Sequence, residues 1–137
     1  MNRVLIADDE LHLARYLQQQ LLAMWPEVDV VALAANGLEA ARLIDELHPD
    51  VAFLDIQMPG LTGVEVAQGI VGPTRVVFVT AYDEYAVQAF DQAALDYVLK
   101  PIKAERLEQA VRRVQAALGS PAQEPGDELV QALRHMA

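Results

Sequence analysis

Five side chains that could take part in phosphoryl or metal chemistry follow short apolar runs of the chain: Asp8, Asp9, Asp55, Thr80 and Lys100. Carboxylates that lie close together repel one another unless a cation lies between them, and a few oxygen ligands with room for water suit Mg²⁺. One carboxylate could then attack phosphorus, while a hydroxyl and an ammonium group could bind phosphoryl oxygens. The set predicts an acyl phosphate formed on an aspartate with the help of Mg²⁺, provided that the fold brings these residues together.

Each residue of this set also has an ordinary structural explanation. Asp8 or Asp9 could cap the helix that follows, which is the common role of an acid at that place. Asp55 could belong to a turn, Thr80 could simply end a strand, and Lys100 could be a solvated charge. These explanations account for the residues singly, but they do not explain why four separate apolar runs all end in such groups.

The apolar pattern of the chain predicts strands that alternate with helices. Strands are expected at short, unbroken apolar runs, at residues 4–7, 28–35, 51–54, 75–79 and 96–99. Helices are expected where apolar residues recur at helical spacing, at residues 11–25, 38–47, 63–70, 83–93 and 103–118. Crossovers of this kind are right-handed, so the strands should form one parallel, doubly wound α/β sheet with helices on both faces. Ligand sites in such sheets lie at the carboxyl ends of the strands, where the five side chains stand.

Four pieces of the sequence resemble the receiver domains of bacterial two-component response regulators. They are LIADDE at residues 5–10, FLDIQMPG at 53–60, VTAY at 79–82 and YVLKP at 97–101. The resemblance implies the (βα)5 fold that is called flavodoxin-like or CheY-like, with a five-stranded parallel sheet in the order 2-1-3-4-5. We expect this receiver domain to occupy residues 1–118.

The resemblance also implies a role for each acidic residue of the set. Asp55 matches the aspartate that is phosphorylated in the family. Asp8 and Asp9 match its metal-binding pair, and the main-chain carbonyl of Gln57 matches a further ligand, so that Mg²⁺ is held by Asp8, Asp9, Asp55 and Gln57. We expect no enzymatic activity beyond phosphotransfer to Asp55 and hydrolysis of the resulting acyl phosphate.

Residues near the ends of the last two strands match further positions of the family pattern. Thr80 and Lys100 match the hydroxyl and the lysine that contact the phosphoryl group. Thr80 and Tyr97 match the pair that rearranges when the phosphoryl group arrives. The resemblance further implies a cis peptide bond before Pro101, which an X-Pro bond can adopt at low cost.

A narrower resemblance, at residues 80–90 (TAYDEYAVQAF) and 94–97 (ALDY), is to receivers of LytTR-type, or LytR/AlgR-like, transcription factors. It implies a sensor histidine kinase as phosphodonor and a phosphorylation-dependent homodimer. The dimer surface would combine the helix expected at 83–93, the strand at 96–99 and the helix at 103–118. DNA would be bound only by an effector domain that this sequence lacks, and we expect residues 119–137 to begin the connection to it.

The composition excludes several other kinds of protein. Twenty acidic residues against ten basic ones give a net charge of −10, which disfavours direct binding of nucleic acid. The chain has no cysteine, so disulfides and thiolate metal sites are excluded. No apolar run approaches the ~20 residues that span a membrane. We therefore expect a soluble cytoplasmic protein that does not bind membranes.

Three alternative functions compete with a phosphorylated receiver. A phosphatase of the haloacid-dehalogenase type also uses an aspartate nucleophile with Mg²⁺, but it needs a second acid two residues later, where Gln57 stands. A nucleotide-binding protein would carry a glycine-rich loop in place of Asp8 and Asp9. A receiver-like interaction module that is never phosphorylated, or a receiver that acts alone, remains open, although the complete set of functional groups argues against the former.

Overall fold

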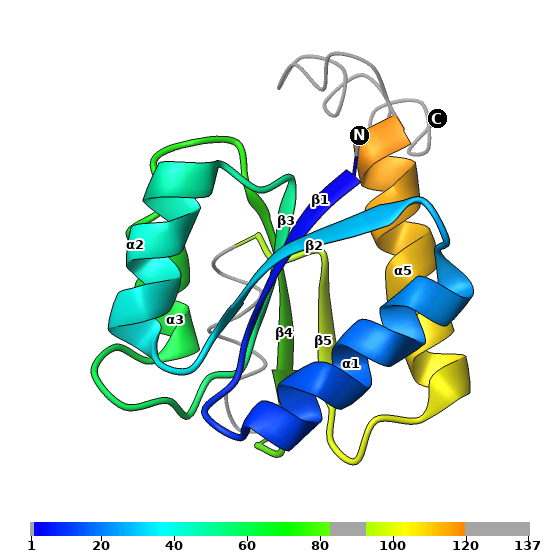
Figure 1. The fold of residues 1–137 in the computed structure, drawn as a ribbon, viewed down its shortest axis with the longest axis horizontal. Helices are drawn as coiled ribbons and strands as arrows, with labels where there is room; N and C mark the ends of the chain where they lie inside the picture. The colour runs from blue at the N-terminus through cyan, green and yellow to red at the C-terminus, as the bar shows by residue number, and fades with distance from the viewer. Residues whose placement is uncertain (1, 83–92, 120–137) are drawn as a thin grey trace, which may run out of the picture.

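Five short stretches of the chain form one parallel sheet in the computed structural model, which describes residues 2–82 and 93–119. The order across the sheet is β2-β1-β3-β4-β5 (Figure 1). The strands are β1 (Asn2–Ala7), β2 (Val28–Ala34), β3 (Val51–Leu54), β4 (Arg75–Thr80) and β5 (Asp96–Leu99). The predicted parallel sheet and its predicted strand order are confirmed.

The helices of the described residues occupy both faces of the sheet (Figure 1). They are α1 (Leu11–Met24), α2 (Gly37–Leu47), α3 (Gly63–Gln68) and α5 (Ala104–Gly119). Apart from Ala93, the helix predicted at residues 83–93 lies outside the described residues. Within the described ranges, no helix has the length and apolar character that crossing a bilayer requires.

Alternating side chains of the strands build two separate cores. Val4 and Ile6 of β1 pack with α1 and α5 on one face, whereas Leu5 and Ala7 pack with α2 and α3 on the other. Strands that are buried on both faces must be apolar at every position. This requirement explains why the strands appear in the sequence as unbroken apolar runs.

The register of the sheet brings the ends of the strands to one edge. Ala7 of β1 pairs with Leu54 of β3, so the aspartates that follow them emerge at the same level. The Asp55 amide donates to the carbonyl of Ala7 at 2.9 Å and thereby extends the ladder by one step. Between β4 and β5, the Lys100 amide donates in the same way to the carbonyl of Thr80 at 2.8 Å. Residues far apart in the sequence are therefore fixed side by side by main-chain hydrogen bonds.

The first turn of α3 packs closely against the main chain that follows β3. Thr62 and Glu65 form a capping box, in which the Thr62 hydroxyl accepts from the Glu65 amide and the Glu65 carboxylate accepts from the Thr62 amide. Gly63 donates its amide to the Ile56 carbonyl at 2.9 Å. A Cβ atom at Gly63 would lie only 2.2 Å from the carbonyl oxygen of Asp55. The absence of a side chain at Gly63 is thus required for the position of the Asp55 main chain.

We predict that Gly63→Ala lowers the free energy of unfolding by about 1–3 kcal/mol, because the added methyl group must displace main-chain atoms. Urea unfolding of the two proteins measures this change. Gly72→Ala is the matched control, since a Cβ atom there meets nothing within 4 Å, and we expect it to change stability by less than about 0.5 kcal/mol. Equal stability of the two variants would show that the Asp55 segment relaxes without cost.

Candidate functional site

A lysine from one strand end binds two carboxylates from two other strand ends. The Lys100 ammonium group donates to Oδ2 of Asp8 at 2.7 Å and to Oδ2 of Asp55 at 3.0 Å. Lys100 follows β5, and its side chain crosses the end of β4 to reach the acids that follow β1 and β3. All three side chains are largely buried, with exposed fractions of 14% for Lys100 and 8% for each aspartate. The structure therefore brings together three of the residues that the sequence predicts to form a site.

The third predicted acid completes a carboxylate cluster at the same edge. One oxygen from each of Asp8, Asp9 and Asp55 lies within 4.8 Å of the others, with Asp9 exposed and the other two buried. Oδ1 of Asp8 accepts a hydrogen bond from the Glu10 amide at 2.9 Å. Glu10, rather than Asp8 or Asp9, is the residue at the N-cap position of α1. An all-oxygen set with one exposed member fits a hard cation such as Mg²⁺.

Burial and neighbouring charges shift the pKa values of Asp55 and Lys100. Burial raises the pKa of the Asp55 carboxyl above its ordinary value of 3.8, and the neighbouring Asp8 raises it further, although Lys100 opposes both effects. Burial alone would lower the pKa of Lys100, but hydrogen bonds to Asp8 and Asp55 outweigh it and raise that pKa. Lys100 is therefore held in its cationic form between two acids.

The two residues predicted to act as a switch are joined through one loop residue. Thr80 is fully buried, and its hydroxyl oxygen accepts a hydrogen bond from the amide of Tyr82 at 3.4 Å. The Tyr97 hydroxyl donates to the carbonyl of the same Tyr82. The Tyr97 ring also packs at a tilt against Phe78, with 6.4 Å between ring centroids. Sequence reasoning missed that the main chain of Tyr82 connects these two residues, because a main-chain contact leaves no signal in residue type.

The remaining predicted residues lie around the same site. The peptide bond between Lys100 and Pro101 is cis. Gln57 is exposed and lines a cleft of about 490 Å³ together with Asp9, Asp55 and Lys100. Asp8 and Thr80 are buried and do not line this cleft. The cleft gives a small molecule or an incoming group access to Asp55 from solvent.

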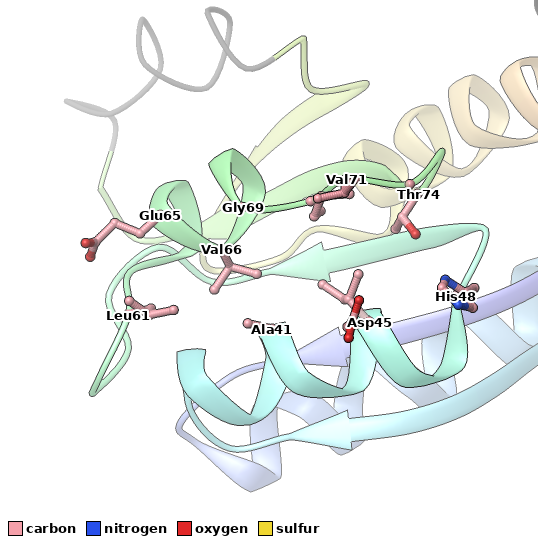
Figure 2. A pocket seen from close by; sticks show the side chains of 12 residues that line it. Ala41, Asp45, His48, Leu61, Glu65, Val66, Gly69, Val71 and Thr74 are labelled. Carbon is pink, nitrogen blue, oxygen red and sulfur yellow. The ribbon is translucent and has the colours of Figure 1, made fainter.

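A second cavity, of about 280 Å³, lies between α2 and the segment around α3 (Figure 2). Ala41 and Asp45 of α2 face Val66 and its neighbours across it (Figure 2). None of the predicted site residues lines this cavity. The chemistry predicted from the sequence therefore belongs to the cleft at the sheet edge.

Comparisons with known proteins agree with the doubly wound parallel sheet described above. A family model described as the response regulator receiver domain matches residues 4–112. The chain therefore belongs to the response-regulator receiver domain family of two-component systems. The predicted family is confirmed.

Individual relatives and structures agree with this assignment. An uncharacterized response regulatory protein of Vibrio cholerae is 46% identical over 116 residues, which cover 83% of this chain and 48% of that protein. The transcriptional regulatory protein BtsR of Escherichia coli is 43% identical over 117 residues, covering 83% and 48%. The crystal structure of the response regulatory domain of protein mrkE from Klebsiella pneumoniae has a TM-score of 0.79 at 31% identity, covering 84% of this chain and 96% of that chain. The chain spans about half the length of the curated relatives that it matches.

These matches do not decide every prediction from the sequence. The narrower resemblance to LytTR-type receivers stays a prediction, as do the domain boundaries at residues 1–118 and 119–137. The individual roles of the site residues also stay predictions, although their geometry is now known.

We predict that Asp55→Asn has a higher melting temperature than the wild type at pH 7 in the absence of divalent cations. A carboxyl whose pKa is raised on folding stabilises the folded state while it is protonated, and that stability is lost as the pH rises through the raised pKa. The side-chain amide introduced by Asp55→Asn carries no charge at any of these pH values, so the variant does not lose stability as the pH rises. The advantage should therefore shrink as the pH falls toward 3.8, where the wild-type carboxyl is protonated as well.

Thermal unfolding followed by circular dichroism across this pH range measures the effect. Asp29→Asn, which removes an exposed carboxylate of β2, controls for the change in net charge. A lower melting temperature for Asp55→Asn at pH 7 would mean that the contact with Lys100 outweighs the cost of burying the charge.

Proposed function

We propose that this chain is a phosphorylation-switched receiver in which Asp55 accepts a phosphoryl group from a sensor histidine kinase. The single observation that supports the proposal most strongly is the contact of Lys100 with both Asp8 and Asp55 beside an open cleft. This contact supplies a nucleophile, a metal-binding carboxylate and a fixed positive charge at one point. Membership of the receiver family supports the same assignment.

In the proposed transfer, a carboxylate oxygen of Asp55 forms a bond to phosphorus. The bond between phosphorus and the kinase's phosphohistidine nitrogen breaks, and its electron pair stays on that nitrogen. Bound by Asp8, Asp9, Asp55 and the Gln57 carbonyl, Mg²⁺ would neutralise negative charge on the phosphoryl group. Hydrolysis later returns the Asp55 carboxylate and inorganic phosphate when a water oxygen attacks phosphorus.

Lys100 and Thr80 would stabilise the phosphorylated state. Lys100 is cationic and already lies within hydrogen-bond distance of Asp55, so it can bind a phosphoryl oxygen with a small movement. The Thr80 hydroxyl accepts from the Tyr82 amide and keeps its own proton available for a phosphoryl oxygen. Both groups act from fixed strand ends, which lowers the cost of orienting them.

The signal would leave the site through Tyr82 and Tyr97. Movement of Thr80 toward the phosphoryl group alters its contact with Tyr82, whose carbonyl binds the Tyr97 hydroxyl. The result is a shift in population between two arrangements of Tyr97, β5 and α5. We propose that this shift favours a homodimer through β5, α5 and the helix predicted at residues 83–93, which lies outside the described residues.

We propose that the output of the switch is control of transcription in the cytoplasm through a separate LytTR-type effector domain. Relatives such as BtsR are named transcriptional regulators and are about twice as long as the aligned region. The net charge of −10 supports this division, because DNA binding by the receiver itself would be electrostatically unfavourable.

We predict that acetyl phosphate with Mg²⁺ adds one phosphoryl group to the wild-type chain and none to Asp55→Asn. The amide is not a nucleophile, so the bond to phosphorus cannot form. Intact-mass spectrometry measures the addition. Asp29→Asn, with the same loss of charge outside the site, should label like the wild type, and a chelator should abolish labelling.

Two results would count against this proposal in different ways. Labelling that survives in Asp55→Asn would place the phosphoryl group elsewhere. A wild type that neither labels nor gains thermal stability from a beryllium fluoride mimic would favour an interaction module that is never phosphorylated.

A further inference from the structure

One buried carboxylate of the described residues takes no part in the site at the sheet edge. Asp96 opens β5 at the end of the strand remote from Lys100, and 4% of its side chain is exposed. Two arginines of α5 bind it. Arg106 donates to Oδ2 at 2.9 Å and to Oδ1 at 2.5 Å, and Arg113 lies 2.9 Å from Oδ1. Burial alone would raise the pKa of Asp96, but these arginines and a main-chain amide hold it below its ordinary value.

This ion pair also holds the main chain of the tyrosine that follows Asp96. The amide of Tyr97 donates to Asp96 Oδ1 at 2.8 Å, and the carbonyl of Tyr97 accepts from Arg106 Nη2 at 3.1 Å. β5 is the last strand at its side of the described sheet. Main-chain groups on the outer side of such a strand have no neighbouring strand to bind them. At Tyr97, the Asp96 carboxylate binds the main-chain amide and the Arg106 guanidinium binds the main-chain carbonyl, as a neighbouring strand otherwise would.

Tyr97 is therefore bound at two ends. Its hydroxyl contacts the carbonyl of Tyr82, whose amide binds the hydroxyl oxygen of Thr80. Its main chain is bound to α5 through Asp96 and Arg106. Resting on the function proposed above, we propose that Arg106 is a positioning residue that couples Tyr97 to helix α5. A rearrangement of Tyr97 then changes the contacts of α5 instead of being absorbed by a loose edge strand.

Arg113 supplies a natural comparison with Arg106. It lies two helical turns further along α5 and binds the same oxygen of Asp96, but its ion pair does not extend to Tyr97. Its side chain is also more exposed, at 59% against 33% for Arg106. Replacing either arginine removes one positive charge beside Asp96. Only the replacement of Arg106 removes the hydrogen bond to the Tyr97 carbonyl.

The contacts of Asp96 and Arg106 with the main chain of Tyr97 can be tested in the whole chain without phosphorylation. The four tyrosines are labelled with 3-fluorotyrosine, and their fluorine resonances are assigned by single Tyr→Phe replacements. We expect Arg106→Gln to shift or broaden the Tyr97 resonance, and Arg113→Gln to leave it unchanged. Arg106→Lys serves as a second variant if Arg106→Gln does not fold, since one ammonium group cannot reproduce the planar fork of the guanidinium. Equal effects of the Arg106 and Arg113 variants on Tyr97 would overturn the assignment.

The coupling to α5 is tested by hydrogen exchange of residues 104–119 before and after labelling with acetyl phosphate and Mg²⁺. We expect labelling to change exchange in the wild type and in Arg113→Gln. In Arg106→Gln, Asp55 should label at an unchanged rate while the change in α5 is lost. If the Arg106→Gln protein labels and hydrogen exchange in α5 still changes, the role of Arg106 is overturned while the proposed function stands. A wild type that does not label would instead overturn the proposed function. The fluorine resonances would still show whether Arg106 holds Tyr97 in place.

Discussion

The contact of one ammonium group with two buried carboxylates is the interaction on which the site depends. Asp8 and Asp55 are brought together by the pairing of β1 with β3, and their charges would repel one another without Lys100. The parallel register makes this compensation possible, because it delivers residues from three strands to one edge. The same arrangement leaves Asp9 exposed beside the cleft, where a cation can be bound with retained water.

The main chain at Asp55, which follows β3, and the strand before Lys100, β5, are held by different means. Gly63 allows α3 to pack directly on the Asp55 main chain, which fixes the position of the proposed nucleophile. Among the described residues, no further strand lies on the outer side of β5, and the pair of Asp96 and Arg106 holds β5 to α5 at Tyr97. The main chain at Asp55 is thus held by close packing, whereas β5 is held at Tyr97 by polar contacts.

The fold and the principal site residues could be predicted because their causes are visible in residue type. Strands buried on both faces must be apolar throughout, and four of the five apolar runs are followed directly by a predicted site residue. The roles of Tyr82 and Arg106 could not be predicted in this way. The contacts of Tyr82 are made by its main chain, which every residue shares. In the sequence, Arg106 and Arg113 cannot be told from solvated charges on the polar side of a helix. Asp96 looked like one residue of a strand, since only the folded structure places two arginines beside it.

We propose that Asp55, and neither Asp8 nor Asp9, carries the phosphoryl group. Reduction of the labelled protein with sodium borohydride converts an aspartyl phosphate to homoserine, which peptide sequencing by mass spectrometry locates. We expect homoserine at position 55 alone, in protein that was incubated with both acetyl phosphate and Mg²⁺. Homoserine at position 8 or 9, with aspartate retained at position 55, would contradict it.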